Sequence, residues 1–389
     1  MLNVSVHHQP EILIQDRDTI QNELLKELRG LTQALSDNAD AAMQNVYPEG
    51  YVFMNAIYAL AWTSFLRHEE HTDYFAEGYA EIRNAAAKIA SDTGRLPFSE
   101  DLPLPYGAFY IGWSTYVLGS KLGLESADMR DEQEVSQFRH SCEQIAGVIR
   151  QTTYPESYHG AAWPADVMLC AASLSLHDRL FEPRYAGLIR DWLQEVKKRL
   201  DQRGMLPHAV FPQDGRVAAD ARGSSMALML LFLHAIDSQF AQEQFVLFKE
   251  NFLDSKLGLT GICEYPKSDS GNGDIDSGPV VLGFGAAATI VGMQTLALFG
   301  EDELSIVVRN GVEALALPVE SDGSKHYLFG AVPVADAFIT WSHSGLKHQS
   351  KSPDLFFVFH VFSLLIVALL SVLFWMAVPR QFHRFDLTT

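Results

Sequence analysis

The feature that most constrains this fold is an alternation between two kinds of helical segment. The first kind is one-sided: over 184–200, Ile189, Trp192 and Val196 recur every three or four residues, and charged side chains fill the opposite face. The second kind is apolar on every side, as in 51–66, which reads YVFMNAIYALAWTSFL. Because a helix without a polar face has to be buried all around, we expect the apolar segments inside and the one-sided segments outside.

The two kinds of segment follow each other strictly along the chain. The one-sided segments are 17–35, 73–91, 131–150, 184–200, 238–253 and 302–317. The apolar segments are 51–66, 106–122, 164–177, 223–236, 279–299 and 331–342. This order predicts an all-α domain over 1–346 in which six helical hairpins close into an (α/α)6 toroid; a generic helical bundle is the alternative.

A repeat in the connections supports the toroid. GRLPF at 94–98, GMLPH at 204–208 and GLTGI at 258–262 each follow a one-sided segment. Their spacing fits a period of about 55 residues, and glycine just past a helix end supplies a left-handed cap. Over 17–345 the chain resembles the (α/α)6 toroid superfamily, which includes glycoside hydrolases, polysaccharide lyases and enzymes of the linalool dehydratase-isomerase type. The resemblance rests on architecture and carries over no catalytic residue.

A long apolar run lies near the C-terminus. Residues 355–378 read LFFVFHVFSLLIVALLSVLFWMAV, without an acidic or basic residue, and a membrane-crossing helix needs roughly 20 apolar residues. The run predicts a transmembrane helix between a linker at 347–354 and a short tail at 379–389; a buried core helix is the alternative. Because the N-terminus lacks the pattern of a signal peptide, we expect a tail-anchored, single-pass membrane protein with its large domain in the cytoplasm and the lipid bilayer as a partner.

The composition excludes some classes of function. Acidic residues outnumber basic ones by 48 to 29, for a net charge of -19, and such an excess repels the phosphate backbone of nucleic acids. The cysteines are Cys142, Cys170 and Cys263, which form no CxxC pair. This spacing argues against a zinc site and a disulfide framework. We therefore predict no cofactor and no structural metal.

Candidate functional residues gather in the connections that enter the apolar helices. In a toroid these connections lie at one end of the ring, so side chains from different hairpins are expected to meet there. The candidates are Glu49, Tyr106, Glu156, Tyr158, His159, Trp163, Asp166, Asp220, Arg222, Glu264, Asp274 and Asp276.

The acidic stretch 268–278, SDSGNGDIDSG, is the most informative connection. Asp274 and Asp276 are predicted to be catalytic, because two nearby carboxylates can separate their pKa values and share the roles of acid and base. Alternatively, Asp276 or Ser277 caps the helix that follows. Asp269 with the same aspartates also offers oxygen ligands for calcium, although the spacing is not that of an EF-hand.

The third connection holds the other predicted catalytic groups. Tyr158 and His159 can transfer protons, and Trp163 can stack on a sugar ring. Asp166 lies near the start of an apolar helix, where burial raises the pKa of a carboxyl as a general acid requires. Alternatively, Asp166 pairs with Arg222 and is structural.

The remaining candidates are predicted to bind substrate. Arg222 can hold a carboxylate or phosphate with two parallel hydrogen bonds, and Asp220 either contacts substrate or caps the helix at 223–236. Glu49, Tyr106, Glu156 and Glu264 complete this set.

Three functions are consistent with these residues. The first is a carbohydrate-active hydrolase or lyase that uses paired carboxylates among Asp166, Glu264, Asp274 and Asp276. The second is a dehydratase or isomerase on an apolar alcohol or lipid, with Tyr158, His159, Asp166 and Cys170 as proton-transfer groups. The third is a non-catalytic, membrane-tethered binding protein, since fold does not determine function.

Overall fold

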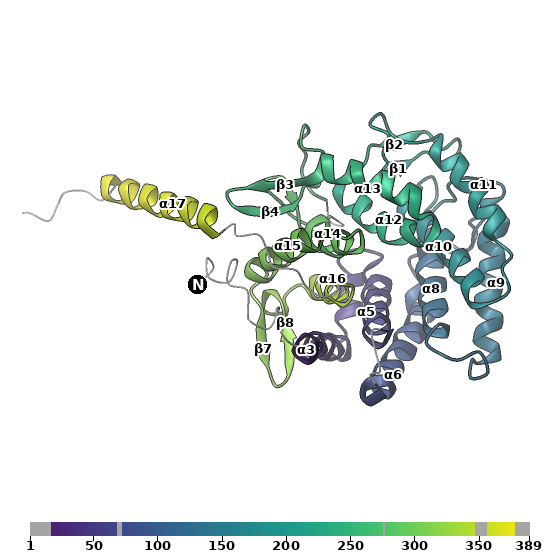
Figure 1. The fold of residues 1–389 in the computed structure, drawn as a ribbon. Helices are drawn as coiled ribbons and strands as arrows, with labels where there is room; N and C mark the ends of the chain where they lie inside the picture. Colours follow the sequence, from purple (N-terminus) through teal and green to yellow (C-terminus); the bar gives the residue numbers. More distant parts are fainter. Residues whose placement is uncertain (1–16, 68–71, 275–276, 347–355, 378–389) are drawn as a thin grey trace, which may run out of the picture.

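The computed structural model describes residues 17–67, 72–274, 277–346 and 356–377. The described chain is predominantly helical, as the alternation predicts (Figure 1). The inner helices are α5 (Gly50–Arg67), α8 (Gly107–Leu122), α10 (Pro164–Leu180), α12 (Gly223–Ile236), α14 (Ala286–Leu298) and α16 (Pro333–Ser344). The outer helices are α3 (Arg17–Ser36), α6 (Thr72–Ile89), α9 (Glu132–Ile149), α11 (Ala186–Lys197), α13 (Ser238–Phe252) and α15 (Asp302–Leu315).

The inner helices form a closed ring. Each packs against the next in chain order from α5 to α16, and α16 packs back against α5. Each outer helix from α6 to α15 packs against the inner helix that precedes it in the chain, and α6 and α9 also pack against the inner helix that follows. α3 packs against both α5 and α16. The first outer helix therefore covers the place where the two ends of the ring meet.

Short hairpins, which the sequence pattern does not predict, occupy the connections into three inner helices. The antiparallel pairs are β1 (Ala209–Val210) with β2 (Val217–Ala219), β3 (Leu253–Lys256) with β4 (Leu259–Ile262), β5 (Val280–Val281) with β6 (Phe284–Gly285), and β7 (Val319–Ser321) with β8 (Ser324–His326). Short helical turns α4 (Ala39–Gln44) and α7 (Asp92–Arg95) lie in other connections, and η1 (Leu328–Gly330) follows β8 in the connection into α16. Because β5 and β6 use residues 280–285, α14 begins later than the predicted helix 279–299.

Aromatic rings from four inner helices fill the middle of the toroid. Phe53 of α5 lies 5.3 Å from Trp113 of α8 and 5.6 Å from Phe338 of α16, between ring centroids. Trp341 of α16 lies 6.4 Å from Trp113 and 6.4 Å from Phe232 of α12. Edge-to-face and offset arrangements at these separations are favourable. The centre of the ring is therefore a packed core, and ligand chemistry has to occur at an end of the ring.

The C-terminal helix requires a correction. α17 (Phe356–Ala377) projects away from the toroid in Figure 1, and its described side chains, over 361–376, are mostly exposed. Among the described residues no helix meets both the length and the apolarity that a membrane crossing requires. This finding overturns the predicted transmembrane helix over Leu355–Val378, and with it the bilayer partner and the tail-anchored location.

Candidate functional site

Five of the connections into inner helices lie side by side at one end of the toroid. The main chain of Ala108 donates to Glu156 (2.9 Å), Val210 to Ala162 (3.1 Å) and Gly223 to Glu264 (2.8 Å). The phenol of Tyr158 donates to Glu49, which joins the third connection to the first. We call this end, formed by the connections that enter α5, α8, α10, α12 and α14, the mouth. The predicted convergence of separate connections is observed here.

Tyr158 is at the centre of one side of the mouth. Its ring stacks on Phe98 at 5.8 Å and meets Trp163 edge-on at 6.0 Å. Its phenol donates to the carboxylate of Glu49, and both side chains are half-buried. A tight turn between Tyr158 and Ala161 presents the tyrosine. An acidic group, a phenol and aromatic faces therefore meet in one place that solvent can reach.

Asp166 lies beside this group, in the first turn of α10. Pro164 occupies the first helical position, where its missing N–H costs no hydrogen bond. The hydroxyl of Ser157 donates to Asp166 Oδ2 at 2.5 Å, and the aspartate is half-buried. Arg222, which the sequence offers as a partner of Asp166, forms its ion pair with Asp274. The first turn of the inner helix and the Ser157 hydroxyl together hold the carboxylate of Asp166 at a fixed point.

The other candidates of the second and third connections have mainly local roles. His159 Nε2 lies 3.0 Å from Asp101 Oδ1 at the rim, with side chains 61% and 75% exposed. The hydroxyl of Ser99 and then His159 lower the pKa of Asp101. Glu156 accepts from the backbone N–H of Gly160 at 2.7 Å and so shapes the turn. Tyr106 has a left-handed backbone (φ 66°) and its ring lies near the guanidinium of Arg95, at 5.9 Å.

Arg222 and Asp274 form an ion pair on the other side of the mouth. Asp274 Oδ1 also accepts from the backbone N–H of Ser277 at 2.9 Å, so both of its oxygens are engaged. Burial opposes ionisation of Asp274, but the Ser277 N–H and the Arg222 guanidinium outweigh it and lower its pKa to about 2. The guanidinium also lies over the ring of Tyr265, at 5.5 Å.

Glu264 lies beneath this ion pair and is completely buried. Its Oε1 accepts from the hydroxyl of Ser224 at 2.8 Å, and its Oε2 has no hydrogen-bond partner among the described residues. Burial raises the pKa of Glu264 to about 7, although Ser224 and Arg222 oppose the shift. Glu264 and Asp274 therefore share a neighbour, Arg222, and have widely separated pKa values.

His208 is a neighbour that the sequence interpretation did not include. Its Nδ1 lies 2.5 Å from the hydroxyl of Ser225, and burial followed by the charge of Arg222 lowers its pKa to about 4. The only signal for His208 in the sequence is its place as the last residue of the repeated connection GMLPH at 204–208. Asp220 is exposed, and Arg222 rather than Asp220 occupies the N-cap position of α12.

The calcium interpretation is supported by neither described aspartate. Asp269 lies 2.8 Å from Arg203, and Asp274 contacts Arg222. Each carboxylate thus already faces a cation. Asp276 and the preceding residue lie outside the described residues.

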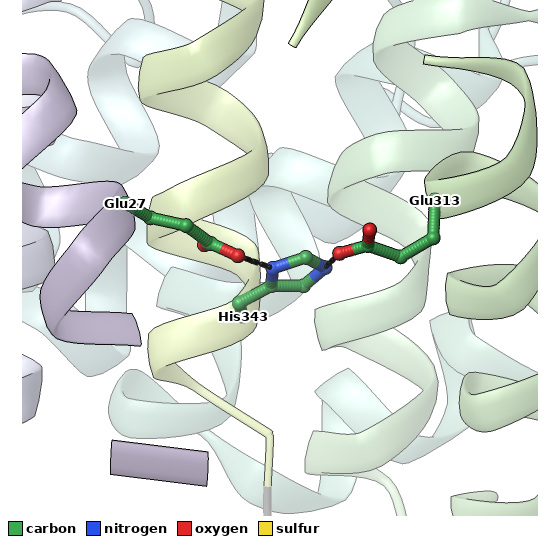
Figure 2. Close-up of side chains that lie close together, drawn as sticks. All are labelled: Glu27, Glu313 and His343. Atoms are coloured by element: carbon green, nitrogen blue, oxygen red, sulfur yellow. Dashed lines mark hydrogen bonds and ion pairs between the residues drawn. The ribbon is translucent and has the colours of Figure 1, made fainter. Parts of the chain in front are cut away.

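A second cluster of charged side chains lies away from the mouth, between α3 and the last hairpin. His343 of α16 donates from Nδ1 to Glu27 of α3 at 3.0 Å, and its Nε2 faces Glu313 of α15 at 3.9 Å (Figure 2). Lys325 of β8 lies 3.2 Å from Glu27 and 3.0 Å from Glu313. The phenol of Tyr327 lies 2.7 Å and 2.8 Å from the same carboxylates. We call these five residues the seam.

The seam contains side-chain atoms that could bind a metal ion, but it also contains the ammonium group of Lys325. The ligand atoms of Glu27, Glu313 and His343 lie within 4.8 Å of one another. However, the ammonium of Lys325 contacts both carboxylates and supplies the positive charge that a metal ion would bring. Burial opposes ionisation of Glu27, but His343 and Lys325 outweigh it and hold its pKa well below the usual range. The seam is therefore an ion-pair network.

A cavity of about 720 Å³ lies at the other end of the hairpins, near the end of α10. Arg130, Arg139 and Phe181 contribute to its lining. The guanidinium of Arg130 donates to the carbonyl groups of Leu122 (2.9 Å) and Leu180 (3.1 Å), so it is committed to the fold. Glu132 and Glu143 also line this cavity, which lies outside the mouth.

Comparison with known proteins identifies the class of fold. No protein-family model and no curated protein matches this sequence. Among solved structures, the chain is similar to a glycoside hydrolase from family 105 of C. acetobutylicum ATCC 824, with a TM-score of 0.51 and 10% sequence identity. The similarity covers 75% of this chain and 92% of the other. At this identity it supports the (α/α)6 toroid fold.

Proposed function

We propose that the mouth is the active site of a carbohydrate-active enzyme that breaks a glycosidic bond. The observation that carries this proposal is the group formed by Asp166, Glu49, Tyr158 and Trp163, in which carboxylates lie beside aromatic rings and remain within reach of solvent. Aromatic faces bind the apolar faces of sugar rings, and carboxylates supply acid and base. The structural similarity to a glycoside hydrolase is consistent with this class of reaction.

In a hydrolysis, Asp166 is the proton donor to the leaving oxygen. Its position on the first turn of α10 and its hydrogen bond from Ser157 fix the carboxyl in one orientation. Glu49 then activates the attacking water, and Tyr158 orients Glu49 through the phenol. Carboxylates in such enzymes are about 5 to 10 Å apart, depending on whether water enters between them.

In an elimination, Tyr158 is the base and Glu49 receives its proton. This route breaks the carbon–hydrogen bond beside a sugar carboxylate and the carbon–oxygen bond to the leaving sugar, whose oxygen takes a proton from Asp166. It leaves a carbon–carbon double bond and uses no water. Because both routes use the same side chains, substitutions do not separate them. The chemical identity of the products does.

The dehydratase-isomerase alternative is less well supported. Its proposed thiol, Cys170, is completely buried in α10, and burial raises its pKa well above the usual range. A thiol in this position is a poor proton-transfer group. The aromatic core also fills the middle of the ring, where a narrow apolar pocket would be needed.

The test is cleavage of an oligosaccharide panel by the full chain and by Asp166→Asn. We expect the substitution to reduce the rate by at least about 100-fold, because it removes the proton donor and preserves the shape of the side chain. Asp101→Asn, which removes an exposed rim carboxylate, is the matched control and should retain the wild-type rate. Oxygen from labelled water in the product indicates hydrolysis, and ultraviolet absorbance of a new double bond indicates elimination.

Two results would contradict the proposal. Equal rates for the wild type and Asp166→Asn would remove Asp166 from the reaction. Binding of glycans without any cleavage would favour a non-catalytic binding protein instead.

A further inference from the structure

Guanidinium groups around the mouth are paired with neighbouring carboxylates. The pairs are Arg222 with Asp274, Arg203 with Asp269 (2.8 Å), Arg199 with Glu195 (2.8 Å) and Arg216 with Asp214 (2.6 Å). The side chain of Arg222 is the least exposed of these guanidiniums, at 20%. A substrate carboxylate would therefore have to displace a protein carboxylate to reach Arg222.

Asp274 is held firmly in its place beside Arg222. Its backbone N–H donates to the hydroxyl of Ser277 at 3.0 Å, and the backbone N–H of Ser277 donates back to Asp274 Oδ1 at 2.9 Å. This reciprocal pair of bonds leaves Oδ2 aimed at the guanidinium. The charge of Arg222 is thus neutralised by a carboxylate that the loop itself orients.

Negative charge at the mouth is less well compensated. Glu49 is held by a phenol, which orients the carboxylate without neutralising its charge. Asp220 is exposed at the same end of the toroid. The chain as a whole carries a net charge of -19, which adds to the negative potential. A surface with one sign of charge attracts ligands of the opposite sign and repels those of the same sign.

We infer that the substrate is a glycan of neutral or amino-bearing sugars and that polyuronates are excluded. This inference rests on the proposed function and deepens it. Elimination requires a sugar carboxylate to acidify the hydrogen that is removed, so exclusion of uronates leaves hydrolysis. A bond forms between the anomeric carbon and the water oxygen while the glycosidic carbon–oxygen bond breaks. Asp166 gives its proton to the leaving oxygen, and the water proton passes to Glu49.

The experiment measures binding of three tetrasaccharides to the full chain by calorimetry at low and high salt. The probes are a glucosamine tetramer, cellotetraose and tetragalacturonate, which are cationic, neutral and anionic. At low salt we expect the glucosamine tetramer to bind about tenfold more tightly than cellotetraose, and tetragalacturonate to bind most weakly. High salt should reduce these differences, because it screens exposed charges.

A matched pair of variants tests the part of Arg222. Asp274→Asn frees this guanidinium and should strengthen tetragalacturonate binding about tenfold, with no comparable gain for cellotetraose. Asp269→Asn removes the same charge from the same connection but frees Arg203, and should give a much smaller gain. Equal gains would reduce the effect to net charge and overturn the role of Arg222.

The remaining outcomes separate this inference from the proposed function. Tightest binding of tetragalacturonate by the wild type would overturn the substrate class and leave a carbohydrate-active enzyme in place. Absence of binding and of cleavage for every glycan would overturn both.

Discussion

The mouth and the seam both contain several carboxylates, but they differ in how deeply these are buried and in whether a cation neutralises them. At the seam, Glu27 and Lys325 are 2% and 5% exposed, and the charged groups face one another. At the mouth, Glu49 and Asp166 are half-buried and held by hydroxyl groups. Buried charges that satisfy one another stabilise a particular arrangement of the chain, whereas partly exposed carboxylates remain available to a ligand.

The chain connectivity explains the difference. Glu27 and Lys325 are 298 residues apart, and their contact joins the first outer helix to the last hairpin. The seam therefore lies where the ring closes. The mouth is built from connections of neighbouring hairpins, which the ring holds in place. We conclude that the seam serves the closure of the toroid, and the mouth is where we propose the chemistry.

The largest effect on stability is expected from Lys325→Met. This substitution leaves the buried Glu27 and the half-buried Glu313 without the ammonium between them, and such a loss typically costs about 3 to 5 kcal/mol. The free energy of unfolding can be measured by chemical denaturation. The rate of glycan cleavage per folded molecule should stay the same, because the seam is separate from the mouth.

Lys26→Met is the matched control for this experiment. Lys26 also lies on α3 and contacts two glutamates, Glu23 at 2.7 Å and Glu320 at 2.9 Å, but its side chain is 33% exposed. Solvent screens such a pair, so the loss should be below about 1 kcal/mol. Equal losses for the two lysines would contradict the assignment of the seam as a buried closure.

A slightly smaller effect is expected from Glu264→Gln, and it should depend on pH. Burial raises the pKa of Glu264 to about 7, so between pH 5 and 7 the folded state holds a proton that the unfolded state releases. The contribution of Glu264 to stability is therefore greatest at low pH and is lost as the pH rises through about 7. Between low pH and pH values above about 7, this contribution to the free energy of unfolding changes by about 3 kcal/mol.

Glutamine stays neutral at every pH and should remove this slope. The difference in unfolding free energy between Glu264→Gln and the wild type should therefore shift in favour of the variant from pH 5 to pH 8. Glu243→Gln, on the exposed face of α13, is the control and should leave the slope unchanged. If the difference between the variant and the wild type did not change over this range, Glu264 would be ionised in the folded protein.

The alternation of helices was predictable because its cause is local. A helix shows its buried face every three or four residues, so segments such as 184–200 show their burial in the sequence itself. The hairpins were missed because strands of two to four residues leave no comparable period. The helix expected at 279–299 begins at Ala286 for that reason.

The pairing of side chains was much less predictable. Glu27 resembles an ordinary charged residue of an amphipathic helix, and its partners in the last hairpin are identified only by the closure of the ring. The sequence offers Arg222 as a partner of Asp166, whereas the fifth connection brings Asp274 to it. Such contacts depend on loop conformations that no local pattern encodes. The convergence of the connections, by contrast, followed from the order of the helices.

The smallest effect concerns backbone strain at the mouth. Leu282 and Gly283 form the turn between β5 and β6 with φ angles of 55° and 87°, and Leu282 is 53% exposed. Asparagine tolerates this left-handed conformation better than leucine and precedes glycine in favoured two-residue hairpins. We expect Leu282→Asn to stabilise the chain by about 1 kcal/mol in chemical denaturation. Leu96→Asn, at an exposed leucine with φ -47°, should give no gain in stability.

Strain at functional sites often persists because it serves them, so a stabilised variant that cleaves glycans more slowly would extend the active site to this turn. An unchanged rate would confine the active site to the charged and aromatic residues, and a loss of stability would contradict the interpretation of Leu282 as strained.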